Sequence, residues 1–313
     1  MKKIYVVIFV ILLFSMKSCI STEHEVIFLR NEKLSTIRES SLINSIQDSK
    51  FKFKSVVLNS EEEFGEYVKE NLESKKIRSK TFIISEEFSN LVNINDESIY
   101  SNLVYINGVE EGRINLKIDQ RHLSYIFGVI SGMLTRTNNV AIIYESELKD
   151  SFENVLSFVA GVKNVNLRAY DLLLNGENVL NLNSSSEEDK ILNLESFIKN
   201  NKSDVIFYLD NQLIDNAVNI SEEVSKTLFT LNEFQEELFV SVSYLYEDIL
   251  SGIISSNVEF RTYNVNILDN TIDINIDNLP EEINQVVRNT LDRMKNGNVT
   301  FPSTWEELKI ISN

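Results

Sequence analysis

The sequence predicts an α/β protein built as two doubly wound lobes. From Glu25 onward, short apolar runs alternate with longer amphipathic stretches, a pattern typical of βα units around a buried parallel sheet. The alternation restarts after a largely apolar helix that begins near Leu123. A single sheet would need roughly ten strands, which is near the practical limit for a twisted sheet, so two lobes are favoured.

The first set of units is rich in β-branched and aromatic residues between polar turns, which favours strands over helices in the short runs. The expected strands are Glu25–Arg30, Phe51–Leu58, Thr81–Ser85, Ser101–Ile106 and Ile114–Ile118. The expected helices, where apolar residues recur at helical spacing, are Thr36–Gln47 and Glu61–Ser74.

The second set follows the same rhythm. Serines followed by acids at residues 184–188 predict a helix start, because serine caps and acids favour the first turn. Pro280 and Gly297 suit the first turn and the C-cap of a last helix. The expected helices are Leu123–Leu134, Glu147–Val162, 184–200, Ile214–Val224, Val240–Ile254 and Pro280–Lys295. The expected strands are Val140–Tyr144, Asn166–Leu172, Asp204–Leu209 and Lys226–Leu231, with a closing hairpin of Glu259–Ile267 and Thr271–Ile276 around Asp269 and Asn270.

The amino terminus predicts an exported, lipid-anchored protein. Lys2 and Lys3 precede an apolar run from Ile4 to Ser15, too short for a membrane span of about 20 residues but suited to a secretory signal at residues 1–18. Cys19, the only cysteine, cannot form an internal disulfide, and lipidation after cleavage would account for it, with residues 19–24 as a tether. Lys17 favours the alternative of an ordinary signal peptide with an unrelated cysteine, because this place is usually small or apolar.

The charge of the chain excludes one class of partner. The formal net charge is −17, and removal of residues 1–18, which hold three lysines and no acids, takes it to −20. Nucleic-acid phosphates require neutralisation by Lys and Arg, so no nucleic-acid partner is expected. Solubility is the simplest interpretation of so acidic a surface.

No motif indicates catalysis or a metal site. The two histidines, His24 and His122, stand in no HExxH spacing, and no GxSxG nucleophile turn or calcium-loop pattern occurs. We therefore expect no enzyme activity, no metal and no cofactor. Gly128 and Gly132 form a GxxxG pattern, which is interpreted as close packing of a helix on a sheet.

A block in the middle of the chain resembles the basic membrane protein family, bacterial lipoproteins that serve as substrate-binding subunits of ABC transporters, several of them purine-nucleoside receptors. The resemblance covers roughly residues 119–302 in order and spacing, and before that only the strand–helix rhythm matches. Its residues are Phe127, Gly128, Ser131–Thr135, Thr137, Val140–Ile143, Phe152, Phe158, Ala160–Lys163, Asn166, Asp204–Phe207, Leu279–Ile283, Lys295, Gly297, Val299 and Pro302.

The resemblance implies a type I periplasmic-binding-protein fold: two Rossmann-like lobes joined by a three-strand hinge, with the ligand held between them. The crossings would lie near Ile118–Arg121, Asn232–Gln235 and Asn264–Ile267. The N-terminal lobe would then comprise 25–118 and 235–264, and the C-terminal lobe 119–234 and 265–313. Open α/β sheets bind ligands at the carboxyl ends of their strands, which here would face the cleft.

The chain departs from the nucleoside-binding pattern at the ligand positions. Arg30–Thr36 lacks the family's Phe, Gly and Asp, and the family's glycine pair is Tyr144-Glu145 here. Bulkier side chains leave a ligand less room than glycine does, which favours a changed or weakened ligand preference. The candidate ligand-binding residues, which follow strand ends or lie at crossings, are Asn31, Tyr144, Glu145, Tyr208, Asp210, Asn211, Asn232 and Gln235.

The sequence is compatible with two functions. The first is a monomeric lipoprotein at the cell membrane, facing the periplasm or the exterior, that closes over a small polar ligand, nucleoside-like by resemblance, and presents it to an ABC permease. The second is a degenerate binding-protein fold reused as a surface interaction lipoprotein or antigen. The second predicts that Tyr144 and Tyr208 fill the cleft.

Overall fold

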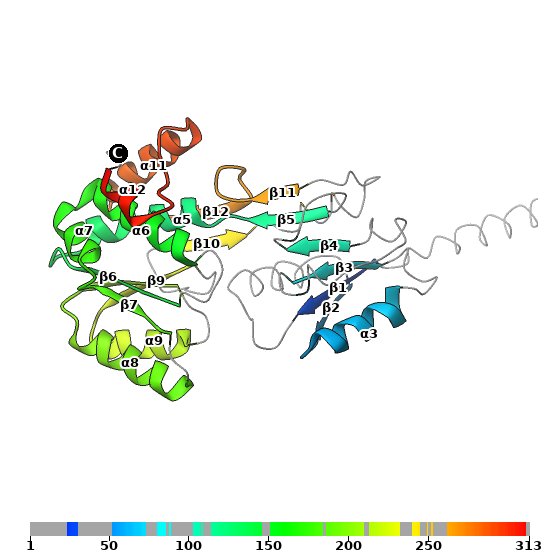
Figure 1. Ribbon diagram of the computed structural model, residues 1–313. Helices are drawn as coiled ribbons and strands as arrows, with labels where there is room; N and C mark the ends of the chain where they lie inside the picture. Colours follow the sequence, from blue (N-terminus) through cyan, green and yellow to red (C-terminus); the bar gives the residue numbers. More distant parts are fainter. Residues whose placement is uncertain are drawn as a thin grey trace, which may run out of the picture.

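The computed structural model describes residues 24–30, 52–72, 80–85, 88, 103–106, 108, 114–145, 151–183, 186–209, 213–231, 240–244, 249, 252 and 262–310. Within these residues the strands form two parallel sheets and one antiparallel pair (Figure 1). The α/β class and the parallel sheets predicted from the sequence are confirmed.

The first sheet has the strand order β11-β5-β4-β3-β1-β2 and is parallel throughout. Helix α3 covers one face, where the rings of Phe64 and Phe88 stack with centroids 4.6 Å apart. The elements are β1 (Glu25–Arg30), β2 (Lys52–Val57), α3 (Glu61–Leu72), β3 (Lys80–Ile84), β4 (Leu103–Ile106), β5 (Ile114–Ile118) and β11 (Thr262–Val265).

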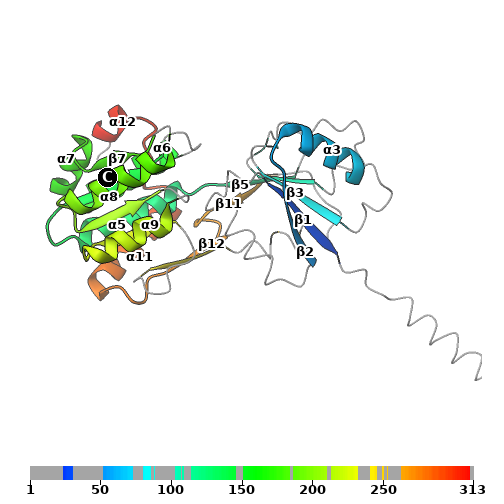
Figure 2. The same cartoon turned by 90° about the horizontal axis from the view of Figure 1, so that it is seen from below.

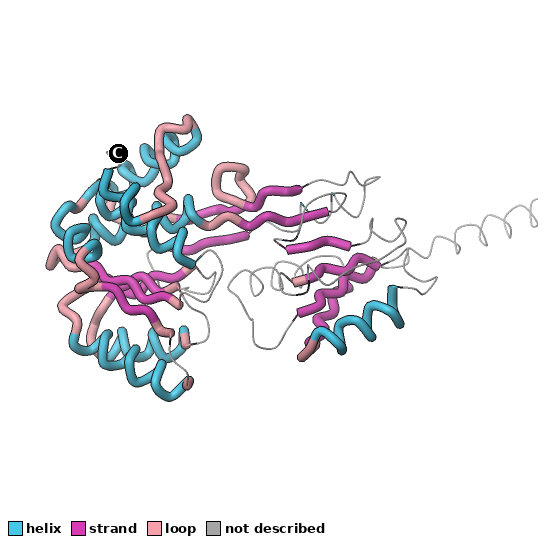
Figure 3. Tube along the Cα trace, in the orientation of Figure 1, coloured by secondary structure: helices cyan, strands magenta, loops and turns pink. Residues whose placement is uncertain are grey.

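The second sheet has the parallel order β7-β6-β8-β9, from strands β6 (Val140–Tyr144), β7 (Val179–Asn181), β8 (Val205–Tyr208) and β9 (Thr227–Thr230). Helices cover both faces, which explains why β8 is buried at every position (Figures 1 and 3). One face carries α5 (Arg121–Leu134), α6 (Ser151–Val165), α7 (Leu167–Leu174), α11 (Glu281–Lys295) and α12 (Trp305–Ile310), and the other carries α8 (Glu187–Asn200) and α9 (Ile214–Glu223).

A short antiparallel pair completes the described strands. β10 (Ser241–Tyr244) pairs with β12 (Ile272–Asn275), with Ser241 opposite Asn275. Figure 1 shows β10 and β12 between the two parallel sheets, and Figure 2 shows β12 there from below. By the expected division, β10 would belong to the N-terminal lobe and β12 to the C-terminal lobe, so this pair joins segments assigned to different lobes. The division of the chain into lobes stays a prediction.

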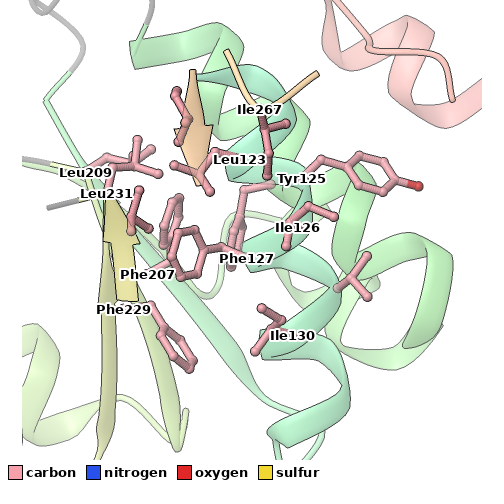
Figure 4. Close-up of a cluster of buried hydrophobic side chains, with 14 of the residues drawn as sticks. Leu123, Tyr125, Ile126, Phe127, Ile130, Phe207, Leu209, Phe229, Leu231 and Ile267 are labelled. Atoms are coloured by element: carbon pink, nitrogen blue, oxygen red, sulfur yellow. The ribbon is translucent and has the colours of Figure 1, made fainter. Parts of the chain in front are cut away.

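Helix α5 lies at the centre of the main core. Every residue from Leu123 to Gly132 is buried, as expected for a helix that is apolar on most of its circumference. Figure 4 shows Phe127 directed at Phe207 and Phe229, with ring centroids 5.6 and 5.7 Å away. Phe158 of α6 stacks on Phe207 at 4.4 Å with the planes 5° apart, so α5, α6 and β8 share one aromatic cluster.

Two glycines allow α5 and α6 to touch through their backbones. A Cβ on Gly128 would lie 2.1 Å from the carbonyl oxygen of Phe158, and a Cβ on Gly161 would lie 2.1 Å from that of Tyr125. A Cβ on Gly132 would meet the Val165 side chain at 2.7 Å. The GxxxG pattern therefore serves helix–helix packing, and the expectation that it packs on a sheet is wrong.

Three expected elements are wrong. Asn166–Leu172 is not a strand but the start of α7, whose N-cap Asn166 accepts a hydrogen bond from the Ala169 backbone N–H at 3.0 Å. Val240–Ile254, expected to be helical, contains strand β10 at Ser241–Tyr244. The expected closing hairpin does not form, because β11 pairs with β5 and β12 pairs with β10.

We expect Gly128→Ala and Gly161→Ala each to lower the free energy of unfolding by at least about 2 kcal/mol, because a rigid Cβ would overlap a backbone oxygen. Gly132→Ala should cost less, since it meets a side chain that can rotate. Urea denaturation followed by circular dichroism measures the effect.

Gly65→Ala is the matched control, because Gly65 lies inside α3 with nothing within 4 Å of its added Cβ. It should stabilise the protein by up to about 1 kcal/mol through helix propensity. Equal stability changes in the Gly65 and Gly128 variants would contradict the close helix crossing.

Candidate ligand-binding site

The carboxyl ends of the parallel strands form the candidate site. In Figure 1 the arrows of β1, β3, β4 and β5 point toward the second sheet. Figure 4 shows Leu209 and Leu231, which directly follow β8 and β9, beside Leu123 and Ile267. Leu123 and Ile267 come shortly after β5 and β11, the two strands from which the chain leaves the first sheet. The carboxyl edge of the second sheet therefore lies beside the segments that connect the two sheets.

Glu145 directly follows β6 at this edge and forms a buried ion pair. Its Oε1 contacts Nζ of Lys190, which lies in the second turn of α8. The two side chains are only 6% and 12% exposed, so the pair is largely removed from water. The second oxygen, Oε2, is buried and has no hydrogen-bond partner in the structure, so the carboxylate is only partly satisfied.

The two candidate tyrosines lie on opposite sides of the sheet. Tyr208 is fully buried in the cluster under α8 and α9, on the same side as the Glu145–Lys190 pair. Tyr144 is half-buried against the core that contains α5, and burial raises the pKa of its phenol. The structure thus brings Glu145 and Tyr208 to one face and separates Tyr144 from them.

The other candidates lie outside the described residues. They are Asn31, Asp210, Asn211, Asn232 and Gln235, and the predicted lipidation site Cys19 is outside as well. A ligand-binding role for all eight candidates stays a prediction.

Lys190 was missed by the sequence analysis. It stands after three acids in the first turn of α8, behind the N-cap Ser186, whose hydroxyl accepts from the Asp189 N–H at 3.2 Å. A lysine in such a charged helix start is usually solvent-exposed. Only the placement of α8 beside the end of β6 brings Lys190 to Glu145, so no local signal could have identified it.

The segment that leaves β5 is held by a second charged cluster. Arg121 donates to both oxygens of Asp119, at 3.0 Å from Nε and 2.6 Å from Nη2, and its Nη1 lies 3.4 Å from Glu153 of α6. Burial works to raise the pKa of Asp119, but the hydrogen bonds and charge of Arg121 outweigh it and lower that pKa. The Asp119 N–H also donates to the Val265 carbonyl at 3.0 Å, which ties this segment to the end of β11.

The described residues contain neither a metal-site arrangement nor a membrane-spanning helix. No group of three His, Cys, Asp or Glu side chains there has the arrangement of a metal site. None of the described helices combines the length and the apolar character needed to cross a bilayer.

Comparison with solved structures identifies the fold. A transcriptional activator of the comK gene from Bacillus halodurans superposes with a TM-score of 0.66 at 15% identity, over 89% of this chain and 99% of that one. An ABC transporter solute-binding protein from Aeropyrum pernix gives 0.63 at 9% identity (91% and 97% covered). A second one, from Conexibacter woesei, gives 0.61 at 10% (89% and 98%). The chain has the type I periplasmic-binding-protein fold. No protein-family model and no curated protein matches the sequence.

With the fold identified, the residues that carry the family resemblance can be given structural roles. Asp204, just before β8, accepts hydrogen bonds from Thr135 Oγ1 at 2.5 Å, Thr137 Oγ1 at 2.8 Å and the Arg136 N–H at 2.7 Å. These contacts join the turn before β6 to the start of β8, at the amino edge of the sheet. Burial favours a higher pKa for Asp204, but the two hydroxyls and the backbone N–H lower that pKa overall.

We expect Asp204→Asn to lower the free energy of unfolding by about 2 kcal/mol at pH 7, because it removes the charge that accepts three hydrogen bonds. Since folding lowers the pKa of Asp204 below its ordinary value of 3.8, the contribution is fully present well above that pH. It is lost as pH falls through the lowered pKa. Urea denaturation at pH 7 and at steps below pH 4 measures this.

The control is Asp292→Asn, which changes an exposed aspartate of α11. Its effect should stay within about 0.5 kcal/mol at every pH. If the wild-type advantage over Asp204→Asn is the same at pH 7 and below the lowered pKa, the charged hydrogen-bond network is not its source.

Proposed function

We propose that this chain is a binding protein that takes up a small polar ligand at the carboxyl edges of its two parallel sheets. The observation that carries the proposal is the arrangement of these edges: strands of the first sheet point toward the second, and the ends of β8 and β9 lie at the connection between them. Such edges are where open α/β sheets bind ligands, and closure of two lobes around a hinge is a common binding motion.

Two finer statements belong to the same proposal. The protein is a lipoprotein anchored through Cys19 at the cell membrane, facing the periplasm or exterior, and it delivers its ligand to an ABC permease. It is a divergent relative of the basic membrane protein family, and its ligand is nucleoside-like. The support is the signal segment before Cys19 and the block of similar residues from about 119 to 302. The proposal involves no catalysis and no cofactor.

A second function has its own supporting observation. Glu145 is paired with Lys190 and buried, at a place where the basic membrane protein family, by the resemblance, has glycine. A binding-protein fold whose ligand space is filled by its own side chains would suit a surface interaction lipoprotein or antigen. A permease gene beside this one would favour transport, and an isolated gene would favour the second function.

For the chain without its signal segment, we expect saturable thermal stabilisation by at least one class among nucleosides, sugars and amino acids. A ligand at 100 times its Kd adds about 2.7 kcal/mol, because it binds only the folded state. For a chain of this size, that raises Tm by about 5 °C. Differential scanning fluorimetry over a ligand titration measures the shift.

The matched comparison for each nucleoside is its 5′-monophosphate, which separates binding of the neutral compound from a general effect of added solute. No saturable shift with any class would contradict the binding function and favour the interaction protein. Shifts with sugars or amino acids but no nucleoside would leave the binding function standing and remove the nucleoside-like ligand.

We expect Cys19→Ala to abolish lipidation, because its thiol is the attachment point that the proposal requires. Labelling of expressing cells with a tagged palmitate, followed by detection on the purified protein, measures this. Ser18→Ala, which keeps a small residue before the cysteine, is the control and should retain the label. A labelled Cys19→Ala protein, or an unlabelled wild type, would contradict the anchor.

A further inference from the structure

The Glu145–Lys190 pair contains an unused hydrogen-bond acceptor. Nζ of Lys190 contacts Oε1 of Glu145, while Oε2 is buried and without a partner in the structure. The Glu145 side chain is 6% exposed, so bulk water does not solvate this oxygen freely. Buried charged groups normally have all their oxygens hydrogen-bonded, because an unsatisfied acceptor is costly away from water.

The location of this oxygen relates it to ligand binding. Glu145 is the first residue after β6, and on the neighbouring strand β8 the register places Tyr208 opposite Ile143, two residues before Glu145. Glu145 therefore stands beyond the carboxyl end of the two neighbouring strands. That is the side on which parallel α/β sheets bind ligands.

The charges of the pair restrict what this oxygen can bind. An anionic group would be repelled by the carboxylate, and the nearby ammonium of Lys190 is already engaged with Oε1. A cationic group would be repelled by that same ammonium. A neutral hydroxyl donates one hydrogen bond to the carboxylate and brings no charge into this poorly solvated place.

We propose that Glu145 is a specificity-determining residue whose Oε2 accepts a hydrogen bond from a hydroxyl group of a neutral ligand, and that Lys190 is the positioning residue that holds it. The inference rests on the proposed function and narrows the ligand to neutral hydroxylated molecules, such as sugars and nucleosides, over their phosphorylated forms. Sugars and nucleosides both offer neutral hydroxyl groups, and the experiment below tests them separately.

Isothermal titration calorimetry of the chain without its signal segment tests the inference, with D-ribose, adenosine and inosine as probes. Ribose 5-phosphate and adenosine monophosphate are the anionic counterparts, and putrescine is the cationic probe. We expect at least one neutral probe to bind more tightly than its phosphorylated form. Glu145→Gln should weaken that binding tenfold to about a hundredfold, the usual effect of losing a charged hydrogen-bond acceptor.

Two further variants separate recognition from stability. Glu145→Gln with Lys190→Met removes both charges, so it leaves no unpaired buried charge and should unfold at a temperature close to that of the wild type. It should still bind weakly. Glu195→Gln removes the exposed partner of Lys199 on the same helix, where the side chains are 44% and 38% exposed, and should bind as the wild type does.

Each outcome decides the inference. Weakened binding in both Glu145 variants, with Glu195→Gln unchanged, supports it. A double variant that binds a neutral probe with wild-type Kd overturns it and leaves the binding function standing. If only charged probes bind, or only amino acids bind in the thermal-shift screen, the inference is likewise overturned and the binding function stands. If no compound in either experiment binds, the proposed function and this inference fall together.

Discussion

Helices α5 and α6 cross so closely that Gly128 and Gly161 each face a backbone carbonyl of the opposite helix. Helix α5 begins at Arg121, three residues after β5 ends, so this contact sets where the chain arrives after leaving the first sheet. It also places Phe127 and Phe158 on the same ring of β8, Phe207. The second sheet, its aromatic core and the connection to the first sheet therefore depend on this one helix crossing.

The sequence contains most of the information needed for the fold where the signal is local. The buried runs of β6 and β8, the cap at Ser186 and the turn at Gly297 after α11 are where the residues predict them. The errors occur where partners are remote. β11 and β12 are neighbours in sequence and look like a hairpin, but each pairs with a strand elsewhere in the chain. Residues 166–172 look like a strand until Asn166 is recognised as a helix cap.

The candidate site could be predicted only in outline. That residues after strand ends lie at one edge follows from a parallel sheet, and Glu145 does stand there. The direction of each side chain depends on register. Alternate residues of β8 point to opposite faces, so Phe207 joins the core with α5 while Tyr208 joins the core with α8. The partner of Glu145 comes from a helix 45 residues later, which no local pattern indicates.

The residues that hold the helix crossing and the amino edge of the second sheet lie apart from the Glu145–Lys190 pair at its carboxyl edge. Gly128 and Gly161 make the helix crossing, Thr135 and Thr137 hold Asp204 at the amino edge, and Lys163 donates to the Leu308 carbonyl at 2.8 Å. These residues maintain packing and connections. The fold itself is shared with solute-binding proteins and a transcriptional activator at 9 to 15% identity. Because one fold can hold sites for many different ligands, ligand identity has to be argued from Glu145, Lys190 and their surroundings, and not from the fold.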